Sequence, residues 1–316
     1  MIDAFLVMLR NVSVFVLLAA PAFLLVKLGL IKEQESGVLS KLLTYLGMPF
    51  LILSSTLNVS FSGDFTKKIV CVGVLGITFT VGMFFLSALL PSKDGEEKKR
   101  GMARFCMIFS NNGFLGIPLA KAVFGNSPVL TYVIILNIIT NVLMFTLGIY
   151  LISGDKDRIS LKKALLTPVL IAFVIGIFLN LVKVNDYIPE VGVFATHFSN
   201  LVTPLSMTIL GIKMAGVKFG AIFSNTRMYF VALAKLILIP ILGVALTLAL
   251  GSIFTVNADM VIGFFIAFAM PTAGLATTFA DRYEGDTENA VAFTLGTTLL
   301  SMVTIPVLYW ILLALV

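Results

Sequence analysis

The sequence predicts an all-α polytopic membrane protein of ten transmembrane helices, arranged as a five-plus-five inverted repeat whose fourth and ninth helices are broken and cross. Three observations lead to this fold class: the composition, the length of the apolar runs, and helix breakers that recur in the two halves. Of the 316 residues, 59% are hydrophobic and only 12% are charged, which is too apolar for a water-soluble protein of this size. The bilayer is therefore expected to surround most of the chain.

Apolar runs of the length that a bilayer requires mark the ten spans. A helix rises about 1.5 Å per residue, so about 20 residues cross about 30 Å of hydrocarbon. Seven runs contain no charged residue and no histidine: 42–63, 69–90, 128–152, 164–182, 236–258, 260–280 and 289–316. Three further runs are shorter or interrupted: 5–30, 105–120 and 191–212.

The basic residues occupy short loops between these spans. The net charge of +6 therefore indicates membrane orientation and gives no reason to expect a nucleic-acid partner. If the N-terminal side is called side A, its loops hold 5 Lys and Arg residues, whereas the loops of side B hold 16. Because basic loops stay in the cytoplasm, we expect side B to be cytoplasmic and both termini to be extracytoplasmic in a multi-pass cell (inner) membrane protein.

No polar stretch is long enough for a soluble domain, so residues 1–316 are expected to form a single membrane domain. The first repeat would cover about 1–152, a cytoplasmic linker 153–163, and the second repeat about 164–316. The two cysteines have neither metal-ligand nor redox spacing, and no cofactor or metal is expected.

Helix breakers in the two halves suggest the repeat. Pro49 in the second span and Pro204 in the seventh are 155 residues apart, and Pro118 in the fourth and Pro271 in the ninth are 153 apart. Each half holds five spans, an odd number, so the second half must enter the membrane the opposite way. Proline and glycine are common in membrane helices, so coincidence is the alternative explanation.

Neutral polar side chains beside the two breaks form the candidate binding site. A break in the membrane leaves backbone groups unpaired, and each costs several kcal/mol in hydrocarbon, so the break must face protein, ion, substrate or water. The free N-terminal ends of half-helices suit a carboxylate. The expected substrate-binding residues are Asn111, Asn112, Gly113, Pro118, Asn137, Asn141, Pro271, Thr272 and Gly274. Asn137 and Asn141 share a helix face, and structural hydrogen bonding between helices is an equal alternative for this pair.

Ser110, Lys235 and Thr297 form a possible ion or charge site. An ionisable residue within a span usually marks a pathway or an ion pair, but Lys235 lies only eight residues after Arg227 and could instead extend to the interface. No carboxylate lies deep in any span, which removes the usual proton relay. A sodium site of neutral oxygens stays open, so Na⁺ or H⁺ is a possible coupling ion.

Two motifs resemble those of the auxin efflux carrier family. SNNGFLGIPLAKAVFG at 110–125 is similar to the signature of its fourth span, and AMPTAGLATTFADRYEGD at 269–286 resembles its ninth. The resemblance implies a scaffold of spans one, two, six and seven, a transport domain of the remaining spans, and elevator-like alternating access. Asn111 matches the crossover asparagine of the plant carriers, Pro118 their GIP proline and Pro271 the ninth-span crossover proline. Ser110 stands where the plant carriers have proline, which makes auxin itself doubtful.

The predicted function is secondary-active transport of a small organic anion, a carboxylate such as malate, malonate or an auxin-like weak acid. This family prediction implies substrate and lipid as partners, with a homodimer as a possible assembly. Catalysis is not expected, because no H-E-x-x-H or G-x-S-x-G motif is present. Two alternatives stay open: a sodium-coupled organic anion symporter like those of the distantly related bile acid symporter family, and a membrane receptor that binds without transport.

Overall fold

The computed structural model describes residues 2–315 except 58, 60, 61, 92–94, 160, 217, 218 and 252–255. Within these residues the chain is helical, with one isolated β-bridge and no longer strand. The helices are α1 (Ile2–Lys27), α2 (Ser36–Leu42), α3 (Met48–Thr56), α4 (Gly63–Leu86), α5 (Glu97–Ile108), α6 (Ile117–Phe124), α7 (Pro128–Leu143), α8 (Ile149–Ser153), α9 (Leu161–Leu165), α10 (Pro168–Leu181), α11 (Val184–Tyr187), α12 (Pro189–Ser199), α13 (Val202–Ala215), α14 (Phe219–Phe223), α15 (Thr226–Leu233), α16 (Ile239–Ala249), α17 (Ala258–Ala269), α18 (Ala276–Arg282) and α19 (Thr287–Leu312).

Seven helical segments of the described chain are long and apolar enough to cross a bilayer. They are Phe5–Lys27, Glu33–Thr56, Gly63–Leu89, Pro128–Ser153, Pro189–Ala215, Thr226–Ala249 and Thr287–Leu312. Three shorter apolar helices lie where the other three spans are predicted: Asn112–Phe124, Pro168–Leu181 and Ala258–Ala269. The predicted all-helical, polytopic membrane protein is confirmed, whereas the count of ten spans and the inverted repeat stay predictions.

The bounds of the predicted spans differ from those in the structure, as the second, sixth and eighth spans illustrate. The second helical segment begins at Glu33, not at residue 42, and the eighth begins at Thr226, not at residue 236. The prediction began each span at its first charge-free residue, but long basic side chains are tolerated inside helices when their charged ends find acceptors or water. The sixth span is shorter than predicted because Pro168, which has no N–H, starts a new helix whose cap is the Thr167 side chain.

Four helical segments contain a widened π-helical turn: Leu43–Gly47, Asn112–Gly116, Met144–Gly148 and Ala234–Leu238. Three of these turns end just before a proline, at Pro49, Pro118 and Pro240. Proline removes one backbone hydrogen bond and clashes with the carbonyl four residues earlier, and a wider turn relieves that clash. Two of the turns carry residues of the candidate site, Asn112 and Lys235.

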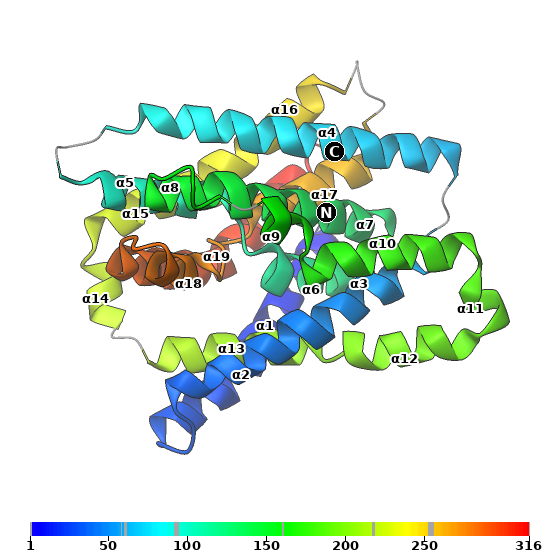
Figure 1. Ribbon diagram of the computed structural model, residues 1–316, viewed down its shortest axis with the longest axis horizontal. Coiled ribbons are helices and arrows are strands. Elements are labelled where there is room, and N and C mark those ends of the chain that lie inside the picture. The colour runs from blue at the N-terminus through cyan, green and yellow to red at the C-terminus, as the bar shows by residue number, and fades with distance from the viewer. Residues whose placement is uncertain are drawn as a thin grey trace.

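The helices expected to form a scaffold pack on one another. α1 packs along α13, and α3 packs against α10 and α12. The remaining long helices form a second group, in which α7 packs against α4 and α17, and α19 packs against α15 and α18. Figure 1 shows α4 across the upper part of the view and α12 and α13 end to end along the lower part. Buried apolar side chains form two clusters, and both α7 and α17 contribute to each.

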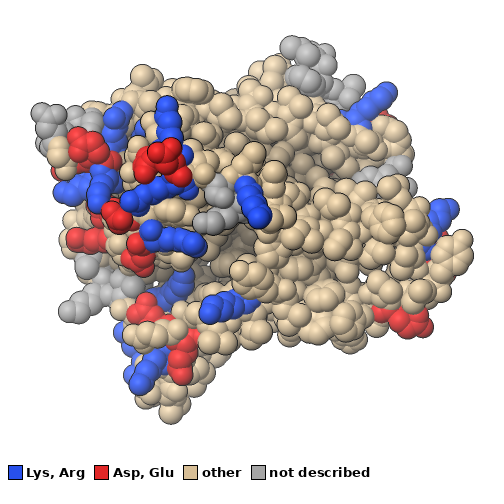
Figure 2. Space-filling model, viewed as in Figure 1, with Lys and Arg blue, Asp and Glu red and all other residues tan. Residues whose placement is uncertain are grey.

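Charged side chains gather at one end of the molecule. Figure 2 shows this end over α5, α15 and α18, separated by an apolar face from a smaller charged group at the opposite end. At the first end Arg227 donates two hydrogen bonds, of 2.7 and 2.8 Å, to the Glu96 carboxylate. This bonding lowers the pKa of Glu96. The arrangement is the one expected of a protein whose middle is covered by lipid.

The two ends of the chain lie together. Phe5 near the start of α1 packs edge to face on Trp310 near the end of α19, with ring centroids 6.4 Å apart. Both termini are thus on the same side of the molecule, as an even number of crossings requires. That this side is extracytoplasmic stays a prediction.

Candidate functional site

The two broken helices meet at their breaks and pair like a minimal β-ladder. Ser110, in the break between α5 and α6, forms an antiparallel bridge with Thr272, in the break between α17 and α18. The Asn111 N–H donates to the Pro271 carbonyl at 2.8 Å, and the Ala273 N–H donates to the Phe109 carbonyl at 2.9 Å. Each break therefore satisfies backbone groups of the other, which is what allows two non-helical segments to persist inside the membrane.

Side chains complete this pairing. The Thr272 hydroxyl donates to the Cys106 carbonyl at 2.9 Å, in the last turn of α5. The Thr272 N–H donates to the Thr297 hydroxyl of α19 at 3.1 Å. Both threonines are fully buried, so they support the crossing from within and do not face a cavity. Carbonyls at helix ends need such partners because no later turn supplies an N–H.

Pro118 and Pro271, the prolines that suggested the repeat, do not lie at the same place relative to their breaks. Thr272, the partner of Ser110, follows it by 162 residues, whereas Pro118 and Pro271 are 153 residues apart. Pro271 lies in its break, but Pro118 lies beyond the first break, near the start of α6. The two prolines therefore lie at different places relative to their breaks, and the inverted repeat stays a prediction.

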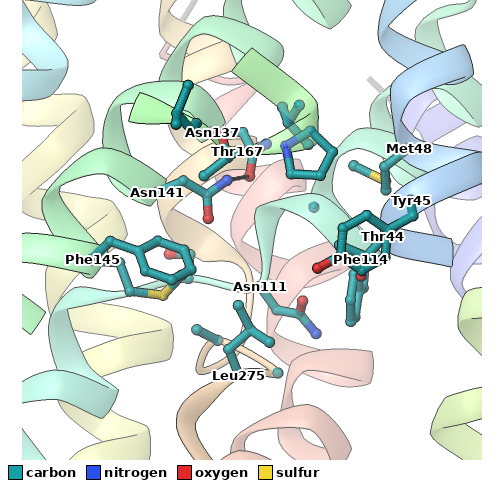
Figure 3. A pocket seen from close by; sticks show the side chains of 18 of the residues that line it. Thr44, Tyr45, Met48, Asn111, Phe114, Asn137, Asn141, Phe145, Thr167 and Leu275 are labelled. Atoms are coloured by element: carbon teal, nitrogen blue, oxygen red, sulfur yellow. Dashed lines mark hydrogen bonds between the residues drawn. The ribbon is translucent and has the colours of Figure 1, made fainter. Parts of the chain in front are cut away.

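A cavity of about 570 Å³ adjoins the crossing. This volume is within the range of about 300–1,000 Å³ that small-molecule sites occupy. Figure 3 shows Asn111 and Leu275 from the breaks on one wall, Asn137 and Asn141 on another, and Tyr45 beside Phe114. Hydroxyl and amide groups alternate with apolar side chains, as in sites that orient a small polar ligand.

The structure brings six of the predicted site residues to this cavity: Ser110, Asn111, Gly113, Asn137, Asn141 and Gly274. The Asn141 amide donates to the Asn137 side-chain oxygen at 3.2 Å, and this bond within α7 orients both side chains. The Asn137 side-chain nitrogen has no hydrogen-bond partner among the described residues. This nitrogen is a donor available near the cavity. Both side chains line the cavity, and substrate binding by this pair stays a prediction beside the alternative of structural hydrogen bonding.

Six other predicted residues do not line the cavity: Asn112, Pro118, Lys235, Pro271, Thr272 and Thr297. All are buried in the protein around the crossing. Thr272 is turned away from the cavity, bonding to Cys106 and Thr297, and a role of these six residues in binding stays a prediction. Asn112 is fully buried with both side-chain amide atoms unpaired among the described residues.

Lys235 lies behind the cavity wall. Its side chain is fully buried, and its amine donates to the Ser110 hydroxyl and lies 3.5 Å from the Phe268 carbonyl oxygen. The alternative that this lysine extends to the membrane interface is therefore wrong. The sequence could not decide this point, because the π-helical turn Ala234–Leu238 that carries the lysine aims it at a break 125 residues earlier.

Lys162 and Arg282 also line the cavity, and sequence reasoning assigned them only to loops. Both side chains are exposed, so they form a cationic mouth. Figure 2 shows the molecule hollowed near the middle of the drawn face, with basic side chains beside the hollow. Thr44, Tyr45 and Thr167 add hydroxyl groups that the sequence did not single out, because nothing in their local pattern differs from an ordinary membrane helix.

Two broken helices that cross beside a cavity of this size, within an all-helical membrane protein, are typical of membrane transporters. A family model described as "Membrane transport protein" matches residues 6–309. The chain belongs to this family, which includes the auxin efflux carriers, and the family predicted from the two motifs is confirmed.

Two relatives are similar along almost their whole length. An uncharacterized transporter of Methanothermobacter thermautotrophicus is 26% identical over 301 residues, which cover 94% of each chain. An uncharacterized transporter of Methanocaldococcus jannaschii is 26% identical over 296 residues, which cover 90% of this chain and 92% of that protein. These matches agree with a membrane transporter and carry no statement about substrate.

Proposed function

We propose that the chain is a secondary-active transporter of a small organic anion that carries a carboxylate, such as malate, malonate or an auxin-like weak acid. One observation carries the proposal: the described residues that line the cavity include two cationic and several neutral hydrogen-bonding side chains but no acidic one. Amides and hydroxyls can orient a carboxylate, while the surrounding cations attract it.

The first half of the crossing supports the same ligand. The π-helical turn from Asn112 and the following α6 begin at the cavity, where Gly113 lines the wall. The N-terminal end of a helix carries about half a positive charge and free N–H groups, which favour an anion. Binding at this point would place the carboxylate beside Asn111.

Alternating access would move the crossing past the scaffold helices. The proposal includes ten spans in two inverted repeats, an elevator-type movement of the second group of helices, and a homodimer as the possible assembly. It also places the chain in the cell membrane with both termini extracytoplasmic. The support is the packing of α1 on α13 and of α3 on α10 and α12.

Counterflow in liposomes tests the proposal. We expect purified protein to exchange labelled malate, malonate or indole acetate saturably against the same unlabelled acid, and protein-free liposomes to show no exchange. Binding without flux would instead support a receptor on the same fold. Neither binding nor flux with a wide panel of organic anions would contradict the proposal.

The cationic mouth yields a separate prediction. Replacing Lys162 and Arg282 together by glutamine should raise the apparent KM about two- to tenfold at low salt, because exposed charges steer an anion toward the site. The difference should largely disappear at about 0.5 M salt, where exposed charges are screened. Lys99→Gln is the matched control, since Lys99 is a basic residue of the same charged end that does not line this cavity. An increase that persists at high salt would show that the two residues contact the substrate directly.

A further inference from the structure

Lys235 is a buried ionisable residue that the proposed binding step does not use. Its side chain is fully buried within the segment Thr226–Ala249. The described residues form no ion pair with it, and its amine faces the Ser110 hydroxyl and the Phe268 carbonyl, both neutral oxygens. An ionisable group so placed is costly in a membrane, and it marks function by default.

The oxygens around this amine lie at or just after the C-terminal ends of α5 and α17, the helices that precede the two breaks. Phe268 lies in the last turn of α17, and the N–H that would continue the helix to it, that of Thr272, donates to Thr297 instead. Ser110 follows the end of α5 by two residues. Helix C-terminal ends carry about half a negative charge each, and the π-helical turn of Lys235 packs against both α5 and α17.

This position is one that carriers with broken helices use for a coupling cation. Half-helix C-terminal ends and unwound carbonyls hold Na⁺ or H⁺ in such proteins, because their oxygens and partial charges compensate a cation. A protonated lysine amine supplies the same charge and donates three hydrogen bonds.

We propose that the Lys235 ammonium is the resident cation of the crossing, so that the chain carries its anion without Na⁺. This inference rests on the proposed function. The Ser110 hydroxyl accepts a hydrogen bond from the Lys235 amine, and Ser110 also lines the cavity. The positive charge therefore lies directly behind the wall that a carboxylate would contact. The positive charge is then part of the protein and moves with the crossing helices, so no cation has to bind from solution.

The inference predicts a cation site that appears only when the lysine is removed. The thermal unfolding of purified protein would be compared in sodium chloride and in choline chloride. The wild type should give the same melting temperature in both salts, whereas Lys235→Ala should melt about 2–4 °C higher in sodium, because an ion that binds only the folded state stabilises it. Sodium stabilisation of the wild type, or none in the variant, would overturn the inference.

Lys121→Ala is the matched control. Lys121 is a partly buried lysine whose amine also donates to a serine hydroxyl, that of Ser199 at 2.6 Å, but it lies in α6 away from the bridge between Ser110 and Thr272. Its replacement should create no difference between sodium and choline. If Lys235→Ala is too unstable to purify, Lys235→Gln also removes the charge, and the same sodium-dependent rise is expected.

Counterflow of the wild type separates this inference from the proposed function. Equal rates in sodium and choline support both proposals. Flux that requires sodium overturns the resident cation and leaves the transporter proposal intact. If no organic anion exchanges at all, the proposed function fails, and the melting experiment still decides whether Lys235 occupies a cation site.

Discussion

Replacing Asn111 by aspartate is expected to lower the affinity for a carboxylate substrate by about 100-fold or more, since a like charge at contact distance costs several kcal/mol. The two side chains have nearly the same shape, so the change is one of charge and hydrogen-bond donors. Asn111 lines the cavity, and its backbone N–H is held by the Pro271 carbonyl at 2.8 Å, independently of the side chain. The crossing should therefore remain assembled in the variant.

The measurement is equilibrium binding of the acid that shows counterflow, with circular dichroism to confirm folding. Asn257→Asp is the matched control, because Asn257 caps α17 by accepting from the Met260 N–H at 3.0 Å, and aspartate caps a helix equally well. The control lies outside the cavity lining and should bind like the wild type. Unchanged affinity in Asn111→Asp would remove Asn111 from the binding site.

The class of fold was accessible from the sequence because the bilayer imposes a strong constraint. A span must be apolar over about 20 residues, and no other solvent selects such runs. The bounds were less accessible: the eighth helical segment includes Arg227 and Lys235, which the pattern of charges excluded. Long side chains separate their charge from the backbone by several bonds, so the charge pattern does not fix where a helix begins.

The candidate site was predicted only in part, because the sequence shows where helices break but not how the breaks pair. Glycine and proline near Asn111 and Gly274 indicate broken helices, because those residues interrupt regular hydrogen bonding. Which side chains face the cavity depends on the bridge between Ser110 and Thr272, a contact between segments 162 residues apart. Local patterns carry no information on such a pairing. Lys162, at the mouth of the cavity, was missed because local patterns do not show which distant segments meet there.

The pairing of the breaks also explains why the crossing can act as one unit. The bonds between Asn111 and Pro271 and between Ala273 and Phe109 join two helices, and Thr272 ties them to α5 and α19. On the proposed function, a ligand at Asn111 would be held by a group of helices rather than by one. An elevator-type movement requires such a unit, since substrate must travel with the elements that bind it.

Asn112 allows a test of whether a buried polar side chain serves transport or only packing. Its side chain is fully buried, and neither amide atom has a hydrogen-bond partner among the described residues. An unpaired buried amide destabilises a protein by about 1–3 kcal/mol, so a residue kept only for packing would be better replaced by leucine. On the proposed function, we infer that this amide makes its hydrogen bonds in another state of the transport cycle.

Asn112→Leu is therefore expected to raise the free energy of unfolding by about 1–2 kcal/mol and to slow counterflow about tenfold, because the unpaired amide is gone from this state and its bonds are lost in the other. Asn180→Leu is the opposite control. The two N–H groups of the Asn180 amide are shared among three carbonyls, of Thr56, Leu57 and Val59, at 2.9 to 3.0 Å, so their loss should destabilise the protein. Thermal melts and counterflow measure both effects, and a stable Asn112→Leu that transports at the wild-type rate would make Asn112 a packing residue.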